Sequence, residues 1–257
     1  MLIDIKDYAK QWKEELRSAV QESAHQVPSL AIVQVGSNEA SNRYVRNKLR
    51  DADEVGIHGF LYSCPEGITQ QKLMQVVEDA VERNDAVIVQ LPLPPHLDKD
   101  RIAKLIPPEK DVDGFRVDSW FKPCTPKGIV RYLRACGFPF SGANVVVIGR
   151  SDIVGKPLAQ MLVDEDCTVT LCHSKTKDLW PHIENADLVI TAVGKAGFLD
   201  CGKINVPVID VGINFDEEGK MCGDCWNTEG KDVTPVPGGV GLLTRCALMD
   251  NVICGCC

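Results

Sequence analysis

The first half of the chain alternates short apolar runs with amphipathic segments. The apolar runs at 29–36 (SLAIVQVG), 57–64 (IHGFLYSC) and 85–94 (DAVIVQLPLP) predict strands. The segments between them, 39–56 and 69–84, repeat apolar residues at helical spacing and predict amphipathic helices. This βαβαβ order predicts a parallel sheet covered by helices.

The second half repeats the alternation after an interruption. Over 107–128 the apolar periodicity lapses, and proline, glycine and charged residues indicate a hinge. The pattern then predicts helices and strands in a Rossmann-like order. The helices are expected at 125–137, 155–166, 176–186 and 241–253, and the strands at 144–149, 168–174, 187–194 and 206–214.

Composition and charge narrow the class of protein. A chain of 257 residues with 44% hydrophobic and 25% charged residues is typical of one large or two modest globular domains. The net charge of -8 argues against a general nucleic-acid surface. No apolar run approaches the roughly 20 residues that span a bilayer, and the charged N-terminus lacks a signal-peptide core. We therefore expect a cytoplasmic protein that binds neither nucleic acid nor membrane.

The chain has twelve cysteines, and their scatter favours reduced thiols over a disulfide framework. Cys222 and Cys225 form a C-x-x-C motif, and Cys254, Cys256 and Cys257 crowd the C-terminus. A four-thiolate zinc site is the alternative if these two regions meet in space. Separate thiols are favoured, so no metal site is predicted.

The segment VVVIGRSDIVGKP (145–157) has the order of a nucleotide-binding turn between a strand and a helix. Gly149 permits a sharp turn, and Gly155 permits close backbone approach in the first helical turn. Ser151 can donate its hydroxyl, and the free N–H groups of the next helix favour a phosphate. An ordinary α/β loop with a helix-packing glycine is the alternative.

The end of the next strand indicates which dinucleotide is bound. NAD-selective folds usually place a carboxylate there for the ribose hydroxyls. This chain has His173, Ser174 and Lys175 instead, and Arg150 of the preceding turn can face the same place. A hydroxyl and cations favour the 2′-phosphate of NADP over NAD. The alternative is that Ser174 only caps a helix beginning near Thr176.

The first half carries a second group of candidates. Tyr44 and Lys48 lie four residues apart on one predicted helix face, although solvation is the usual role of such a pair. Gln90 ends a strand where open α/β sheets bind ligands. Asp111 and Asp113 lie in a KDVDGF turn, for which an Asx turn is the alternative. The loop TPVPGGVG (234–241) is too elaborate for a simple connection.

Eight segments together resemble one enzyme family. YVRNK, VIVQLPLP, KDVDGF, PCTPKGI, VVVIGRSDIVGKP, CHSKT, VIDVGIN and TPVPGGVG occur in the order seen in the methylenetetrahydrofolate dehydrogenase/methenyltetrahydrofolate cyclohydrolase family. The chain looks like a bacterial-type bifunctional member, the FolD type, from about residue 32 to residue 251. So many ordered motifs weaken the solvated-surface interpretation of Tyr44 and Lys48.

The resemblance implies a catalytic set of Lys48, Gln90, Tyr44 and Asp113. Lys48 matches the lysine that transfers protons at the one-carbon bridge of the folate, and Gln90 matches the glutamine that tunes it. A partly buried, amide-lined setting would let Lys48 act as acid or base. Tyr44 matches the tyrosine that stacks along the folate, and Asp113 matches the aspartate that anchors the pterin.

The resemblance also implies which residues bind the folate and the cofactor. The expected folate contacts are Tyr44, Gln90, Leu91, Asp113, Pro237, Gly238 and Gly239. NADP contacts are expected from Gly149, Arg150, Ser151, Gly155, His173, Ser174 and Lys175.

The expected fold is α/β, with two domains, a cleft between them and a Rossmann-like parallel sheet in the second. Residues 1–116 and 242–257 would form the folate-binding catalytic domain, and 117–241 the NADP-binding domain. The implied reactions are oxidation of 5,10-methylenetetrahydrofolate to the 5,10-methenyl form with NADP, and hydrolysis of that product to 10-formyltetrahydrofolate. One-carbon metabolism, purine biosynthesis and a homodimer are implied by the same resemblance.

Two other classes fit parts of the pattern. A different two-domain NADP dehydrogenase, similar to shikimate dehydrogenase, would use a lysine and an aspartate on a hydroxyl, but would not need Gln90 or the 234–241 loop. A nucleotide-sensing module without activity is the second alternative. The joint presence of Tyr44, Lys48, Gln90 and Asp113 argues against it.

Overall fold

The computed structural model describes residues 2–23, 26–37 and 39–256. The chain forms two compact units. The N-terminal unit comprises residues 11–124 and 245–257, and the central unit comprises residues 1–10 and 125–244. Each unit is built around its own parallel sheet.

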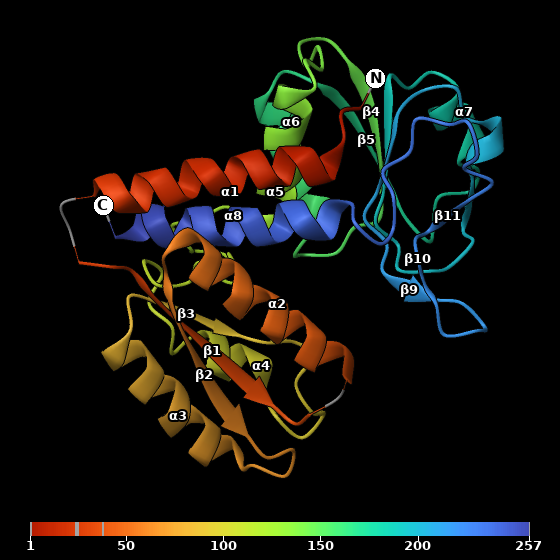
Figure 1. Ribbon diagram of the computed structural model, residues 1–257. Coiled ribbons are helices and arrows are strands. Elements are labelled where there is room, and N and C mark those ends of the chain that lie inside the picture. The colour runs from red at the N-terminus through yellow and green to blue at the C-terminus, as the bar shows by residue number, and fades with distance from the viewer. Residues whose placement is uncertain (1, 24–25, 38, 257) are drawn as a thin grey trace. The chain divides into compact units, whose positions relative to one another are not determined.

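The sheet of the N-terminal unit has the strand order β2-β1-β3, formed by His58–Cys64, Ser29–Val35 and Ala86–Val89. Helix α2 (Glu39–Val55) joins β1 to β2, and α3 (Gln70–Arg83) joins β2 to β3 (Figure 1). Because right-handed crossovers that run in opposite directions across a sheet lie on opposite faces, α2 and α3 cover different sides. The predicted βαβαβ unit is confirmed.

Alternating residues of β1 set the packing of this sheet. Ala31, Val33 and Val35 join a core cluster with Leu73 and Val77 of α3. Helix α4 (Lys99–Ala103) adds Ile102 to the same cluster and is capped by Asp98, which accepts hydrogen bonds from two backbone N–H groups. The sequence pattern missed this helix, because five residues do not establish a period.

The central unit contains a four-stranded parallel sheet in the order β5-β4-β6-β8. These strands are Thr168–Cys172, Asn144–Ile148, Leu188–Thr191 and Val208–Asp210. Residues of β4 alternate between two cores: Val145 and Val147 pack with Leu158 of α6, and Val146 and Ile148 pack with Ile183 of α7. Helices α5 (Cys124–Ala135) and α6 (Gly155–Asp164) contribute to the first core.

Helix α7 (Trp180–Ile183) is much shorter than the expected 176–186. Residues 173–176 form a turn instead, in which Thr176 N donates to His173 O at 2.8 Å. Asp178 Oδ1 then accepts from Trp180 N, and the helix begins only there, with Pro181 in its first turn. The interpretation of Ser174 as a helix cap is therefore wrong.

Small elements follow β6. They are β7 (Leu199–Asp200), the 3₁₀ helix η1 (Cys201–Lys203), β9 (Asn214–Phe215), β10 (Met221–Cys222) and β11 (Cys225–Trp226). β7 pairs with β11 in parallel, and β9 pairs with β10 antiparallel. The expected strand over 206–214 is thus divided into β8 and β9.

Two long helices have residues in both units. α1 (Ile5–Glu22) begins in the central unit, and α8 (Val240–Gly255) ends in the N-terminal unit. Residues 2–10 pack with the central unit, since Ile5 joins the core of α5 and β4, and Tyr132 donates a hydrogen bond to Ile3 O. Within the described ranges, every helix is too short or too polar to cross a bilayer.

Candidate active site

Lys48 is held against the carboxyl end of β3. It lies on α2, and 9% of its surface is exposed. Its ammonium Nζ donates a hydrogen bond to Gln90 Oε1 at 3.2 Å. Gln90 follows the last residue of β3, and its backbone N donates to Val33 O of β1. The contact therefore lies at the carboxyl ends of β1 and β3, where the strand order reverses and open α/β sheets bind ligands.

The amide of Gln90 has one defined orientation. Gln90 Nε2 donates to Leu91 O at 2.8 Å, so its oxygen is the atom presented to Lys48. A lysine ammonium has only donors and requires this arrangement. The Leu91–Pro92 peptide that follows is cis. The pair thus forms a short polar chain in an otherwise apolar strand end.

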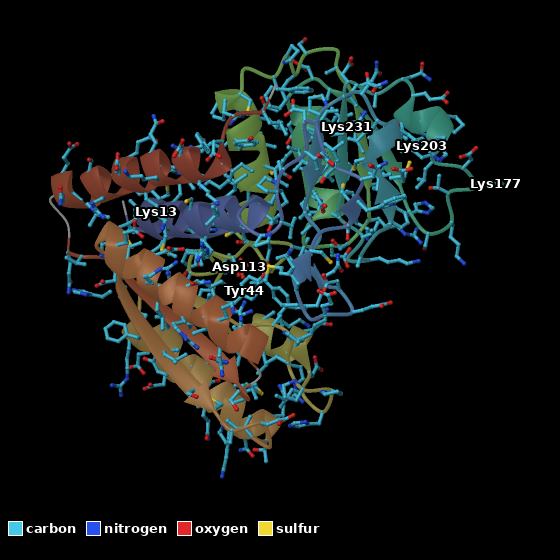
Figure 2. All side chains as sticks on the ribbon, turned by 45° about the vertical axis from the view of Figure 1, so that its right-hand side comes forward. Lys13, Tyr44, Asp113, Lys177, Lys203 and Lys231 are labelled. Atoms are coloured by element: carbon cyan, nitrogen blue, oxygen red, sulfur yellow. The ribbon has the colours of Figure 1, made fainter. Side chains whose placement is uncertain are left out.

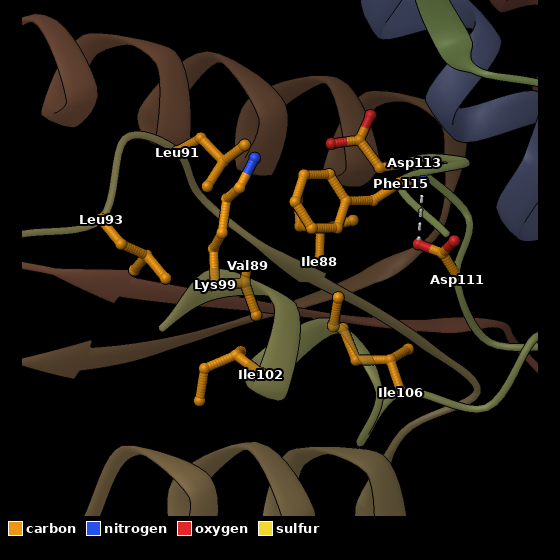
Figure 3. A pocket seen from close by; sticks show the side chains of 11 residues that line it. Ile88, Val89, Leu91, Leu93, Lys99, Ile102, Ile106, Asp111, Asp113 and Phe115 are labelled. Carbon is orange, nitrogen blue, oxygen red and sulfur yellow. Dashed lines mark hydrogen bonds between the residues drawn. The ribbon is translucent and has the colours of Figure 1, made fainter. Parts of the chain in front are cut away.

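A pocket lies beside this strand end (Figure 3). Asp113 and Leu91, both expected at the folate, line it, and its cavity volume is about 20 Å³. The other lining residues come from β3, α4 and the loops before and after α4: Ile88, Val89, Leu93, Lys99, Ile102, Ala103, Ile106, Asp111 and Phe115. The structure thus brings Leu91 and Asp113 to one concave surface.

The two aspartates of the KDVDGF turn have different environments. Asp111 is buried and accepts hydrogen bonds from the backbone N–H groups of Phe115 and Arg116. Burial raises the pKa of Asp111, and those two hydrogen bonds oppose the rise. Asp111 therefore builds the turn, whereas the half-buried Asp113 faces the pocket. Gly114 is required there, because its φ is +67° and a Cβ would lie 2.7 Å from Pro123 N.

Tyr44 lies one turn before Lys48 and is half-buried. Burial raises the pKa of its hydroxyl, and the charge of Arg245 on α8 opposes that rise. Further along α2, buried Asp51 pairs with Arg245 at 3.1 Å and with Lys13 of α1 at 2.7 Å. Lys13, labelled in Figure 2, also pairs with Glu54. These ion pairs hold α2 against α1 and α8, within the two helical turns that follow Lys48.

Sequence reasoning missed Lys99 and Phe115 as pocket residues. Figure 3 shows the Lys99 ammonium and the Asp113 carboxylate toward the same end of the pocket, with the Phe115 ring beside them. Lys99 is the first residue of α4. A cation is unfavourable at the positive end of a helix, so a lysine directly after the capping Asp98 was the available signal.

In the central unit, the Gly149 turn requires its two glycines. The φ of Gly149 is +124°, and a Cβ there would lie 2.2 Å from Ala192 O. A Cβ on Gly155 would lie 1.9 Å from Gly149 O. The turn after β4 is therefore pressed against both the start of α6 and the end of β6. It lies at the strand-order reversal of the sheet, between β4 and β6.

The N–H groups at the start of α6 are not free. Ser151 Oγ accepts from Val154 N and Gly155 N, and Ser151 O accepts from Lys156 N. Leu158 N donates to Val154 O, and Pro157 has no N–H. The expectation of free helix N–H groups is wrong, because Ser151 already satisfies them. Its own hydroxyl proton is not used in these bonds and can still be donated.

The polar residues expected at a dinucleotide phosphate follow the carboxyl ends of the paired strands β4 and β5. Ile148 of β4 is in register with Cys172 of β5, so Arg150 and Ser174 each follow the paired ends by two residues. Arg150, Ser174 and Lys175 are exposed. The ring Nδ1 of His173 accepts from Lys175 N at 3.1 Å and orders the turn. Two cations and a hydroxyl, without a carboxylate in this turn, fit a phosphate.

The 234–241 loop is anchored to β8 by the Thr234 side chain and contains tight backbone turns. Thr234 Oγ1 accepts from Asp210 N at 2.8 Å, and the Val236–Pro237 peptide is cis. A Cβ on Gly239 would lie 2.1 Å from Pro235 O, and Gly238 has a φ of +93°. Pro237 is exposed, and Gly239 is buried.

The cysteines do not assemble a metal centre within residues 2–23, 26–37 and 39–256. No group of three or more His, Cys, Asp or Glu residues there could hold a metal ion. Cys222 and Cys225 are free thiols, and Cys225 donates a hydrogen bond to Cys201 that lowers the pKa of Cys201. Cys257, part of the alternative zinc set, lies outside the described residues.

Both halves of the chain match models of one protein family. Residues 3–113 match the catalytic domain of tetrahydrofolate dehydrogenase/cyclohydrolase, and residues 123–256 match its NAD(P)-binding domain. The chain belongs to the tetrahydrofolate dehydrogenase/cyclohydrolase family. The predicted α/β fold with two domains, the two predicted enzyme activities and a nicotinamide dinucleotide cofactor are thereby confirmed.

Family relatives match over nearly their whole length. The chain is 43% identical to the bifunctional protein FolD of Listeria innocua, over 98% of this chain and 95% of that protein. The crystal structure of FolD from Campylobacter jejuni superposes with a TM-score of 0.92, at 38% identity, covering 100% of this chain and 98% of that one. The FolD structure of Trypanosoma brucei, complexed with NADP and an inhibitor, has a TM-score of 0.91 at 32% identity, covering 99% and 96%.

Proposed function

We propose that the chain oxidises 5,10-methylenetetrahydrofolate with NADP and hydrolyses the methenyl product to 10-formyltetrahydrofolate, with Lys48 as the proton-transfer group. The observation that carries this assignment is the hydrogen bond from Lys48 Nζ to Gln90 Oε1 at the ligand-binding end of β3. A lysine that is buried and held by an amide at a ligand-binding strand end is placed to exchange protons with a bound molecule, whereas a solvated surface lysine is not.

Hydrolysis is the step that needs Lys48. Addition of water to the methenyl carbon forms a C–O bond and releases a proton, and opening of the ring requires a proton on the departing nitrogen. An amine can first accept and then return that proton. Gln90 keeps the ammonium directed at the strand end, because its own Nε2 is committed to Leu91 O.

The surface around Leu91 and Asp113 is the proposed pterin site. A pterin is flat and carries adjacent N–H donors, which a carboxylate accepts in a two-point contact. Asp113 supplies that carboxylate, and Leu91 and the ring of Phe115 supply an apolar wall. Tyr44, on the same face of α2 as Lys48, would stack along the rest of the folate. The family resemblance is the basis for proposing Pro237, Gly238 and Gly239 as further folate contacts.

The Gly149 turn is the proposed NADP site. When bound there, NADP would supply the acceptor for the hydride of the methylene carbon. Gly149 and Gly155 permit the tight backbone at the strand-order reversal, and the Ser151 hydroxyl can donate to a phosphate. Arg150, Ser174 and Lys175, with His173 ordering their turn, would hold the 2′-phosphate. Each charge-assisted hydrogen bond contributes about 1.5–3 kcal/mol, so NADP should bind at least tenfold more tightly than NAD.

The N-terminal unit is proposed as the folate-binding domain and the central unit as the NADP-binding domain. We also propose a homodimer through β2. β2 is an edge strand, and it exposes 49% of Phe60 and 46% of Leu61. Neighbouring large apolar side chains on an exposed edge strand favour contact with another chain. Phe60→Asp should dissociate the dimer in sedimentation experiments, whereas the exposed control Val117→Asp should not. An unchanged dimer in Phe60→Asp would exclude this interface.

The free thiols of Cys222 and Cys225 support the proposed cytoplasmic location, where 10-formyltetrahydrofolate would supply formyl groups to purine biosynthesis.

One assay tests the proposed function. The purified chain is supplied with 5,10-methylenetetrahydrofolate and either NADP or NAD, and reduced nicotinamide, methenyltetrahydrofolate and 10-formyltetrahydrofolate are followed together. We expect all three with NADP, and slower reduction with NAD at equal subsaturating concentration. Absence of turnover with both dinucleotides would contradict the proposal.

A further inference from the structure

Asp224 is a fully buried carboxylate that neither reaction requires directly. It lies in the turn between β10 and β11, and its surface is 0% exposed. A charged group at such depth is retained only where several donors compensate for its lost hydration. Asp224 therefore has a specific set of partners, and the location of those partners indicates what it does.

Most of these partners belong to one short loop. Asp224 Oδ2 accepts from Val193 N at 2.8 Å and from Gly194 N at 3.4 Å, and Oδ1 accepts from Lys195 N at 2.8 Å. Two side chains complete the set: Thr191 Oγ1 at 3.1 Å and Asn214 Nδ2 at 3.0 Å. Three successive backbone N–H groups thus converge on one carboxylate.

This loop forms one wall of the proposed dinucleotide site. It begins at the carboxyl end of β6, directly beside β4. Ala192 N donates to Ile148 O, and Ala192 O lies so near Gly149 that a Cβ there would approach it to 2.2 Å. The 193–195 loop and the Gly149 turn therefore flank the strand-order reversal, where such sheets bind their ligands.

We propose that Asp224 is a positioning residue for the dinucleotide: it holds the 193–195 loop in the conformation that the bound cofactor contacts. The inference rests on the proposed NADP site. The Asp224 carboxylate accounts for the inward direction of three successive backbone N–H groups in this loop.

The chemistry of the side chain makes the role specific to a carboxylate. Both oxygens of Asp224 accept from backbone N–H groups of the loop. In Asp224→Asn, one of these oxygens becomes an NH₂ group, which can only donate. One side of the loop would then lose its acceptor and face a donor. We expect local release of the loop without loss of the parallel sheet, which has its own ladder of hydrogen bonds.

A matched control lies in the same unit. Asp200, at the end of β7, also accepts from one backbone N–H and one asparagine amide, those of Gly202 and Asn227. Neither partner is in the 193–195 loop. Asp200→Asn therefore makes the same chemical change in the neighbouring strand pair, because β7 pairs with β11.

The test compares the full-length wild type, Asp224→Asn and Asp200→Asn by three measurements. Amide hydrogen exchange is measured without any cofactor at Val193, Gly194 and Lys195. Dehydrogenase KM for NADP and kcat are measured with methylenetetrahydrofolate. Cyclohydrolase activity is measured with methenyltetrahydrofolate and no dinucleotide.

In Asp224→Asn we expect at least tenfold faster exchange of the three amides and at least a tenfold higher KM for NADP, with cyclohydrolase activity within about twofold of wild type. Asp200→Asn should leave all three within about twofold. An unchanged KM, or a parallel fall of both activities, would overturn the inference. A wild type without NADP turnover would instead refute the proposed function.

A milder variant decides the matter if Asp224→Asn does not fold. Asn214→Ala removes only one of the side-chain donors to Asp224 and leaves the carboxylate in place. We expect a two- to fivefold rise in KM for NADP, with unchanged cyclohydrolase activity. A KM equal to that of wild type in this variant would also overturn the inference.

Discussion

Lys48→Met separates the two activities of this chain. Methionine has nearly the length of lysine but can neither donate to Gln90 nor carry a proton. Only the hydrolytic step must move protons off water, whereas the dehydrogenase step transfers a hydride between two bound rings. We therefore expect cyclohydrolase activity to disappear and measurable hydride transfer to remain.

The expected magnitudes follow from the geometry. A positioned acid or base contributes about 10²–10⁴-fold to a rate, which corresponds to roughly 3–5 kcal/mol of activation free energy at 1.36 kcal/mol per tenfold. The effect on the free energy of unfolding should be small. Lys48 is 9% exposed, so removing the charge relieves its desolvation, and half-buried Gln90 can hydrogen-bond water instead. We expect a change within about 1 kcal/mol, which moves the Tm by roughly 2–4 °C.

The assay follows disappearance of methenyltetrahydrofolate for hydrolysis, and formation of reduced nicotinamide for oxidation, in the same protein preparation. Lys72→Met, on the exposed side of α3, is the matched control for the loss of a lysine. Lys48→Arg is the informative companion, because arginine keeps the charge and the donors but does not deprotonate at neutral pH. Low hydrolysis in Lys48→Arg would assign the role to proton transfer rather than to charge.

Two outcomes would refute this reasoning. If Lys48→Met retained hydrolysis, the proton-transfer group would be another residue. If oxidation and hydrolysis fell by the same factor while the Tm stayed within the expected range, Lys48 would serve to bind the folate in both steps.

Three further predictions concern the cofactor turn and the buried Asp111. Arg150→Ala should raise the KM for NADP about tenfold or more and leave that for NAD within about twofold, because one charge-assisted hydrogen bond contributes about 1.5–3 kcal/mol; equal changes for both dinucleotides in steady-state assays would contradict the phosphate assignment. Gly155→Ala should abolish NADP binding in calorimetry, because its Cβ would lie 1.9 Å from Gly149 O, whereas Gly67→Ala, with open space at its Cβ, should bind normally. Burial raises the pKa of Asp111, so the folded protein holds that proton more tightly than the unfolded chain does. Its contribution to stability is therefore fully present below the ordinary pKa of about 3.9 and is lost as the pH rises through the raised value. In urea titrations at several pH values, Asp111→Asn should reduce the loss of unfolding free energy that accompanies the rise in pH. An unchanged pH dependence would exclude Asp111 as its source.

Much of the architecture could be predicted from the sequence, because both sheets are parallel and their inner strands β1 and β4 are buried on two faces. Strands of this kind are continuous apolar runs, such as 145–148, and the helices between them repeat at 3.6 residues. The elements that sequence reasoning missed or misjudged are those without a period. Helix α4 has five residues, and α7 has four because the 173–176 turn and Pro181 delay its start.

The candidate site divides in the same way. Tyr44 and Lys48 share a face because of their spacing, and Gln90 ends a strand, so both positions are properties of the local sequence. The hydrogen bond between Lys48 and Gln90 is not, since it joins residues 42 apart through the order of the strands. The same holds for Lys99, which shares a pocket with Asp113 only because α4 packs beside β3.

The sequence by itself determined the α/β class, the glycine turn and the residue types available for chemistry, because periodicity and glycine conformation are local properties of the chain. Only the tertiary structure decided which polar groups are satisfied internally and which face a ligand. Asp111 and Asp113 stand two residues apart in one motif, yet backbone N–H groups occupy the first and the second faces the pocket. Partners distant in sequence, brought together by burial of the two cores, make that distinction.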